Sequence, residues 1–362
     1  MDRRTFLEAG LGVATATSLA GCAGQVNSRS PRAPAIVENR PNGIYLPGHV
    51  EGMQMVGTTE QGDYGFGLMY SYAHRFWNVN GETTSLTEIG PDDDIHLMAS
   101  VWDSETQTIL PETGLSVEIY RDSELISQEA IYPMLSQPMG FHYGANFGLD
   151  GDGTYDVRLS VGGLSTRRTD LFQDRFEQPV TARIPFEYSE SKRDNISFRR
   201  LEDAGSSGAV DPMAMEMLPS SIAPRADVLP GRVVGTGSTD GAVFVTTVLD
   251  SPPAGVVGQG QYLAVSARSQ CNRMVLPAMS LSAAQTRDGE ILSNQRLTRT
   301  LDPSLGYHYG AVVDAVQSGD KLTLSPTLQP QTARHEGYET AFGGETGAME
   351  DINFTVNDQQ SA

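Results

Sequence analysis

The sequence predicts an all-β protein of the sandwich class, and three observations lead to this prediction. From Ile44 onward the chain consists of short strand-like runs separated by Gly, Asp, Asn and Pro, as in residues 148–155. No long stretch after Cys22 has helical periodicity. Several motifs also recur at a fixed distance, which indicates a repeated unit. The clearest candidate strands are residues 66–73, 94–102, 115–120, 155–161 and 181–188.

The N-terminal segment, residues 1–22, has the order of an export signal. Arg3 and Arg4 form the pair typical of twin-arginine export, and a modest apolar run follows over residues 11–20. That run is too short for an ordinary membrane span, and residues 19–22 end in Cys22 as a lipobox does. We therefore expect a lipoprotein held on the extracellular face of the cell membrane by lipid on Cys22. The alternative is a short apolar helix with a chance cysteine.

The rest of the chain divides by composition and by the repeat. We expect a flexible tether at 23–43 and a metal-binding-type sandwich domain at 44–190. A Met-containing linker at 191–228, a degenerate second copy of the domain at 229–357 and a tail at 358–362 are expected to follow. In the linker, Met213, Met215 and Met217 either offer thioethers to a soft metal or form an apolar strip that packs the linker down. Packing is the favoured interpretation.

The repeat is visible in three motifs that recur at one constant offset in residue number. The offset is the distance from Pro111 to Pro277 (277 − 111 = 166). The matching segments are 109–111 with 275–277, 121–122 with 287–288, and 140–144 with 306–310. A shared offset across separate motifs predicts a tandem duplication. Two similar domains on one chain can pair about a pseudo-twofold axis, as the subunits of a homodimer do.

Charge and cysteine content exclude several classes of function. The formal net charge is −20, from 45 acidic and 25 basic residues, and only Lys192 and Lys321 are lysines. Such a surface suits a high-salt, halophilic setting and offers no basic patch to nucleic acid. Beyond the signal, Cys271 is the one thiol, so no internal disulfide is expected. A small buried role is favoured for Cys271, and an electron-transfer cupredoxin is disfavoured because no histidine lies near it in sequence.

Imidazole and thioether groups recur on the candidate strands of the first domain. His96 and Met98 lie two apart on one strand and therefore face the same side. Met134 lies near the end of another strand, and His142 opens the turn that follows. This donor set suits copper and is tolerable for ferrous iron. The chain has no calcium-loop spacing, phosphate loop or nucleophile elbow, and we expect no catalytic turnover.

These motifs resemble a known family. Residues 94–98, 132–134 and 141–146 are similar to the strand, methionine and His-Tyr-Gly-Ala-Asn motifs of the periplasmic iron-transport family, whose members bind copper and support high-affinity ferrous-iron uptake. Residues 52–55 also resemble an early strand of that family. The resemblance implies an immunoglobulin-like β-sandwich that dimerises, with a metal site close to the dimer interface.

The resemblance also implies ligands and marks departures from the family pattern. His96, Met134 and His142 match family ligands, whereas Met98 replaces the family's glutamate and one extra residue separates Met134 from His142. The family's late-loop histidine is matched by His335 of the second copy, while the first copy has Arg167 and Arg168 there. The second copy replaces the strand histidine and the methionine by Tyr262 and Thr300.

Neither copy thus carries the full set, and the hypothesis is a set divided across the pseudo-dimer. His96 would meet His308 and His335, and Met134 with His142 would form a second, poorer site. The alternative for His308 is a hydrogen-bonded core residue. His74 is expected to be a surface packing residue, and no ligand role is expected of His49.

The function expected from these features is an exported, membrane-anchored protein that binds copper or ferrous iron and assists iron uptake by a permease. The chain is expected to act as a homodimer or an intramolecular pseudo-dimer. The alternative is a cell-envelope β-sandwich lipoprotein that binds a surface or a partner without metal.

Overall fold

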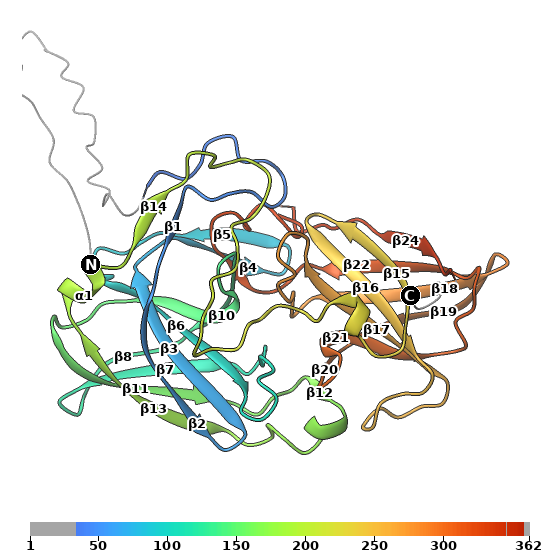
Figure 1. The fold of residues 1–362 in the computed structure, drawn as a ribbon, viewed down its shortest axis with the longest axis horizontal. Coiled ribbons are helices and arrows are strands. Elements are labelled where there is room, and N and C mark those ends of the chain that lie inside the picture. Colours follow the sequence, from blue (N-terminus) through green and yellow to red (C-terminus); the bar gives the residue numbers. More distant parts are fainter. Residues whose placement is uncertain (1–33, 345, 358–362) are drawn as a thin grey trace, which may run out of the picture.

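The computed structural model describes residues 34–344 and 346–357 (Figure 1). The expected export signal, with Arg3, Arg4 and Cys22, lies outside the described residues, as does the tail at 358–362. Within the described ranges, no helix combines the length and the apolar character needed to cross a bilayer.

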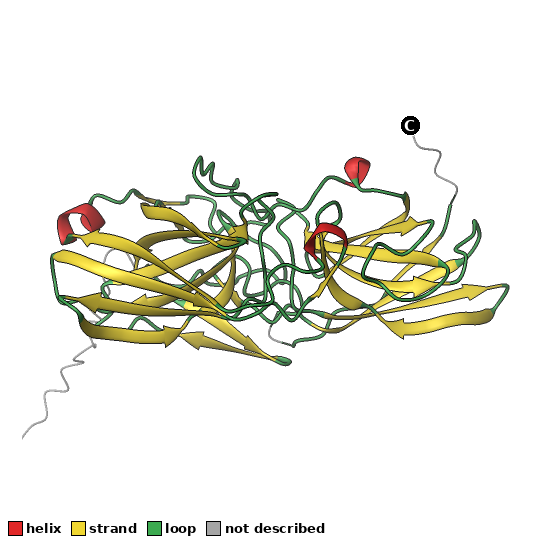
Figure 2. Cartoon of the chain, turned by 90° about the horizontal axis from the view of Figure 1, so that it is seen from below, coloured by secondary structure: helices red, strands yellow, loops and turns green. Residues whose placement is uncertain are grey.

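The all-β prediction is confirmed, because the described chain is almost entirely strands and loops (Figure 2). The helical segments are one short α-helix and two single 3₁₀ turns: α1 (Glu190–Asp194), η1 (Asp170–Phe172) and η2 (Ala226–Val228). Figure 2 shows two layered groups of strands, one at each end, with loops between them. We refer to residues 44–190 as the first copy and to residues 229–357 as the second copy.

The first copy contributes most of two sheets. The larger sheet has, in order, β2 (Gln54–Gln61), β3 (Tyr64–Tyr72), β6 (Ile95–Asp103), β10 (Gly140–Phe147), β9 (Tyr132–Ser136), β23 (Ala333–Arg334), β4 (Phe76–Asn80) and β5 (Thr83–Thr87). The smaller sheet has β13 (Val180–Tyr188), β11 (Gly153–Val161), β7 (Leu115–Arg121) and β8 (Glu124–Ala130).

Alternation along the strands places the core between these two sheets. Over most of β7, β11 and β13, buried residues alternate with partly or fully exposed ones, as in a half-buried antiparallel sheet. Leu97, Val117 and Leu159 meet in this core and are fully buried. Strands β3 and β6 are buried on both faces, since their other face is covered in part by the linker through Leu218.

The second copy repeats this arrangement. Its larger sheet has β12 (Arg167–Arg168), β20 (Thr298–Asp302), β21 (Gly306–Val313), β17 (Gln261–Ser269), β16 (Ala242–Leu249) and β15 (Arg232–Thr239). Its smaller sheet has β19 (Glu290–Arg296), β18 (Ser280–Arg287), β22 (Lys321–Leu328) and β24 (Ile352–Thr355). Strands β17, β20 and β21 are displaced along the chain from β6, β9 and β10 by the offset found in the sequence, at both their first and their last residues.

Two very short strands are exchanged between the copies. Strand β12 leaves the first copy and pairs in parallel with β20 of the second. Its counterpart at the repeat offset, β23, leaves the second copy and inserts between β9 and β4 of the first. The exchange is therefore reciprocal, and it brings the residues that follow β23 onto the larger sheet of the first copy.

The linker is fastened to the first copy rather than free. Its strand β14 (Phe198–Arg200) pairs with β1 (His49–Glu51), and Met213 donates its backbone N–H to the Pro138 carbonyl at 2.8 Å. Met215 packs in an apolar cluster around Leu218, whereas Met217 is more than half exposed. Cys271 is exposed, which corrects the expectation of a small buried residue.

Candidate metal centre

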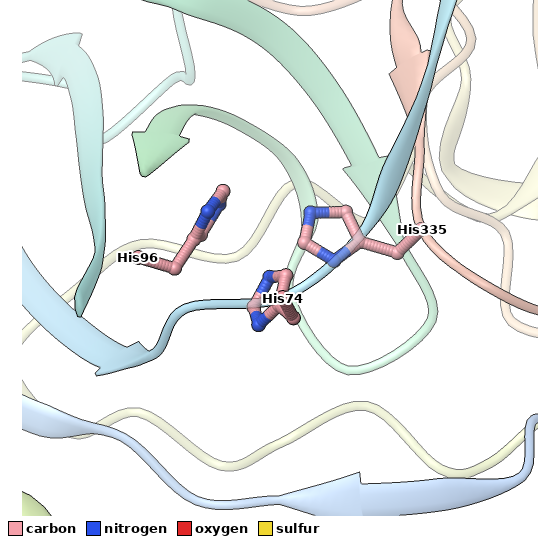
Figure 3. Close-up of side chains that lie close together, drawn as sticks. All are labelled: His74, His96 and His335. Atoms are coloured by element: carbon pink, nitrogen blue, oxygen red, sulfur yellow. The ribbon is translucent and has the colours of Figure 1, made fainter. Parts of the chain in front are cut away.

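Three histidines from separate segments converge at the edge where the copies meet. Ring nitrogens of His74, His96 and His335 all lie within 4.8 Å of one another (Figure 3). His74 follows β3, His96 lies on β6, and His335 directly follows the exchanged strand β23. Their convergence depends on the exchange, because His335 reaches the first copy only through β23.

The orientation of His96 is fixed by its neighbours on the sheet. It lies opposite Asn146 of β10 and is fully buried. The Asn146 amide nitrogen donates to the His74 carbonyl at 3.0 Å, so the amide oxygen faces His96 Nδ1 at 2.7 Å. Nδ1 must therefore carry the proton, which leaves Nε2 as an unprotonated acceptor. That Nε2 is buried without a hydrogen-bond partner in the protein.

His142 repeats the same pattern on the next strand. Its Nδ1 donates to the Gly140 carbonyl at 3.0 Å, and its Nε2 is buried with no partner. The ring lies 5.2 Å from that of His335, centroid to centroid, and His335 Nε2 is also buried and unpaired. A buried acceptor without a partner costs about 1–3 kcal/mol, so three at one place mark a candidate ligand site.

Met134 adds a thioether to this group. It is fully buried on β9, directly opposite His142. A Cβ atom placed on Gly144 would lie 2.6 Å from His96 Nε2 and 3.1 Å from Met134 Sδ. Both donors thus point at the space above Gly144, and any larger residue there would separate them.

A carboxylate supports the fourth imidazole. Glu51 of β1 places Oε1 2.7 Å from His74 Nδ1 and 4.0 Å from His49 Nε2. The His74 ring stacks on His96 with centroids 4.0 Å apart. A carboxylate beside one ring nitrogen of a ligating histidine orients the ring and makes the other nitrogen a better donor.

Burial keeps these imidazoles neutral. Desolvation is the main cause that lowers the pKa of His74 to about 3 and that of His142 to about 4. The same burial, with the neighbouring histidines as a second cause, holds the pKa values of His96 and His335 well below the usual 6.5. Burial also raises the pKa of Glu51 to about 7. The ring nitrogens therefore present lone pairs, not positive charge, at neutral pH.

The predicted division of ligands between two sites needs a correction. Met134 and His142 stand beside His96 and His335 in one cluster, because β9 and β10 are paired neighbours and β23 inserts next to β9. His308 does not join them. Its Nε2 lies 3.0 Å from the Tyr262 hydroxyl in the second copy. This contact agrees with the alternative given for His308 from the sequence, a hydrogen-bonded core residue.

Met98 faces the same side of β6 as His96, and its side chain lines a cavity next to the histidine cluster. That cavity has a volume of about 100 Å³ and is lined by His49, Glu51, Met53, His74, Met98, Met139 and His335 among others. The cavity therefore adjoins His74 and His335 of the histidine cluster. Met98 therefore borders the histidine cluster from the side of this cavity.

Sequence reasoning missed His74 and Glu51 as members of the site. His74 lies in the loop after β3, and Glu51 lies in the very short strand β1, so neither belongs to a periodic segment. The available signal was composition, since His49, Glu51 and His74 are closely spaced in a chain that has only six histidines.

The donor set fits a soft or borderline transition metal. Up to four neutral imidazoles and one thioether converge, and the nearest carboxylate faces His74 from behind. Imidazole suits copper, zinc and iron, and a thioether favours copper in its reduced form. Oxygen-ligated ions such as calcium or magnesium would find no suitable cage in this cluster.

Comparisons with known proteins give one matching family and similar solved structures. Residues 227–355, less than half of the chain, match a family described as a domain of unknown function (DUF7350). No curated protein matches the chain. Among solved structures, FetP of uropathogenic Escherichia coli strain F11 in its as-isolated form is 18% identical, with a TM-score of 0.29, covering 39% of this chain and 96% of FetP.

A copper-bound variant of the same FetP is also 18% identical, with a TM-score of 0.29 over 38% of this chain and 92% of that one. Similarity this low supports no conclusion about chemistry in the present chain. The description of the site therefore rests on its own geometry.

Proposed function

We propose that this protein binds a transition metal ion, copper above others, at the cluster of His96, Met134, His142 and His335, with His74 as an additional ligand. The observation that carries the proposal is the set of buried, unpartnered Nε2 atoms of His96, His142 and His335. Side chains in an ordinary core are hydrogen-bonded. Here the protons of His96 and His142 are held on Nδ1, so that their acceptors face a common space.

Copper is favoured over the other metals for two reasons. The donors that converge are neutral and include a fully buried thioether, a group that selects copper in its reduced form. The cluster also lacks the cysteine thiolates typical of structural zinc sites, since Cys271 is exposed.

In the cell, the bound metal would be captured outside the membrane and delivered to a permease. This part of the proposal rests on the export and lipidation motif at residues 3–22 and on the resemblance to iron-transport proteins. The protein would act as a carrier without catalytic turnover. Ferrous iron is the second cargo or partner metal in this proposal, since imidazoles accept it as well.

Elemental analysis of protein purified without chelator, followed by titration with copper, tests the metal site. The wild type is expected to bind copper stoichiometrically, and His96→Ala with His142→Ala is expected to lose binding. Binding that is equal in the wild type and the double variant, or absent in both, would contradict the proposal. In the latter case an envelope lipoprotein without metal becomes the better description.

A further inference from the structure

The cavity beside the histidine cluster has methionines on one wall. Met53, Met98 and Met139 line it, and His74 and His335 line the side next to the metal centre. They come from three segments: the chain between β1 and β2, strand β6, and the turn between β9 and β10. Their convergence follows from the fold and not from a local methionine-rich sequence.

These methionines belong to a larger sulfur-rich cluster. Met69, Met98 and Met139 are buried together with Trp102 and Leu218, and the partly buried residues packed against them include Met53, Met55 and Met215. Thioethers are soft, polarizable donors without charge. A wall of them can replace water around a soft cation, while it offers nothing to a hard divalent ion.

The second copy shows that the fold does not need methionine here. At the repeat offset, Met98 and Met139 correspond to Ala264 and Leu305, which pack in the equivalent apolar cluster with Tyr262. Alanine and leucine thus fill the same place in the same sheet. Packing alone therefore does not account for sulfur at this wall of the first copy.

We propose that this cavity is a second metal-binding site, in which the thioethers of Met53, Met98 and Met139 hold a soft monovalent cation, Cu(I), next to the histidine cluster. This inference rests on the proposed function, because a cation in the cavity would pass from the methionines to the histidines of the metal centre. A cation held by thioethers keeps its charge near His74 and His335, whose neutral rings are stronger donors and can accept it in turn.

Silver(I) tests the site without redox chemistry. Every titration uses the full folded protein with Cys271→Ser, because the exposed Cys271 thiol would itself bind Ag⁺. With ¹³C-methyl-labelled methionine, Ag⁺ is expected to move the methyl resonances of Met53, Met98 and Met139 in this otherwise wild-type protein and to show two bound equivalents. The triple variant Met53→Leu, Met98→Leu, Met139→Leu keeps side-chain volume. It is expected to bind one equivalent, at the histidines. Met279→Leu, in the core of the second copy, is the matched control and should still bind two.

The outcomes separate the inference from the function on which it rests. One bound equivalent in the wild type with unmoved Met53, Met98 and Met139 methyls overturns the second site and leaves the histidine site standing. No bound Ag⁺ at all overturns both. If the triple variant does not fold, the methyl shifts of the wild type decide the question alone.

Discussion

The two copies place different chemistry at the same point of the same fold. In the first copy, His96, Met134 and His142 surround the space above Gly144. Their counterparts at the repeat offset are Tyr262, Thr300 and His308, around Gly310. The exchanged strand β23 brings His335, which directly follows it, to the first copy, and the exchanged strand β12 brings Arg167 to the second.

Arg167 lies among the second-copy counterparts of the histidine cluster. Its guanidinium donates to Thr300 Oγ1 at 2.9 Å, to the Tyr262 hydroxyl at 2.8 Å and to the Gly310 carbonyl at 2.9 Å. The Tyr262 hydroxyl in turn lies 3.0 Å from His308 Nε2. The second copy thus contains its own cation, whereas the histidine cluster on the first copy leaves the Nε2 atoms of His96, His142 and His335, among others, without a partner. The same scaffold thus holds a hydrogen-bonded core in the second copy and a cluster of unpartnered imidazoles in the first.

The largest expected effect compares the two histidine motifs. His96→Ala should weaken copper binding by more than about 100-fold, since loss of a ligand exceeds the range typical of residues that only orient ligands. His308→Ala should leave copper affinity unchanged. Isothermal titration with copper measures both. A similar loss in the two variants would contradict the assignment of the site to the first copy.

A smaller effect is expected for Glu51→Gln, which keeps the shape of the side chain but removes the charge beside His74 Nδ1. Copper affinity should fall by about 10- to 100-fold, the range for partners that orient ligating histidines. Glu60→Gln, on an exposed side chain of β2, is the matched control. If both variants bind copper like the wild type, Glu51 has no role in orienting His74.

Substitution of Arg167 in the core of the second copy should lower the stability of the protein and leave its copper affinity unchanged. Arg167→Leu leaves the buried Tyr262 hydroxyl and Thr300 without this donor, and should lower the free energy of unfolding by about 1–3 kcal/mol. Arg183→Leu, a largely exposed arginine, should change it little. Urea unfolding monitored by far-ultraviolet circular dichroism gives both values. Copper affinity that falls along with stability would show that the copies are not independent in function.

The smallest effect is expected from pH. Because the pKa of His142 is lowered to about 4 and that of His74 to about 3, protons do not compete for these rings between pH 7.5 and 6. In the Glu51→Gln variant, in which the carboxyl group with a pKa of about 7 is absent, copper affinity should therefore change less than about threefold over this range, against roughly 50-fold for three histidines with ordinary pKa values. Competition titrations at pH 7.5 and pH 6 distinguish the small change in copper affinity from the large one.

The same shifts fix the sign of the acid response of the metal-free protein. A histidine whose pKa is lower in the folded than in the unfolded chain contributes stability that is full above about pH 6.5 and is lost as the pH falls toward 4. Thermal unfolding of the metal-free protein at pH 7 and pH 5 should show this loss. Equal stability at the two values would contradict the burial of these rings.

Part of this structure was predictable from the sequence. Strand positions followed from alternation and turn residues, so the candidate strand at 155–161 lies on β11, and the constant offset between the copies recurs in the strands. His96, Met134 and His142 were found because they lie in or beside such strands and match the motifs of the iron-transport family. The neighbourhood of His308 was not predictable, since a repeated motif does not say which copy supplies the remaining ligand.

The exchange of β12 and β23 was beyond sequence reasoning for a physical reason. Strands as short as these have no periodicity, and their pairing depends on contacts between distant segments. His74 was missed on similar grounds, because a loop residue acquires its role from Asn146 and Glu51, which lie on other strands.

The reciprocal exchange of β12 and β23 has a consequence for how the site responds to dilution. In a centre shared by two separate chains, every tenfold drop in protein concentration favours dissociation and loss of the ligand from the partner. Here His335 is tethered to the same polypeptide as His96, so its effective concentration is set by the fold and does not depend on the amount of protein. Under the proposed function, a metal carrier present at low density would thus keep its full affinity as a single molecule.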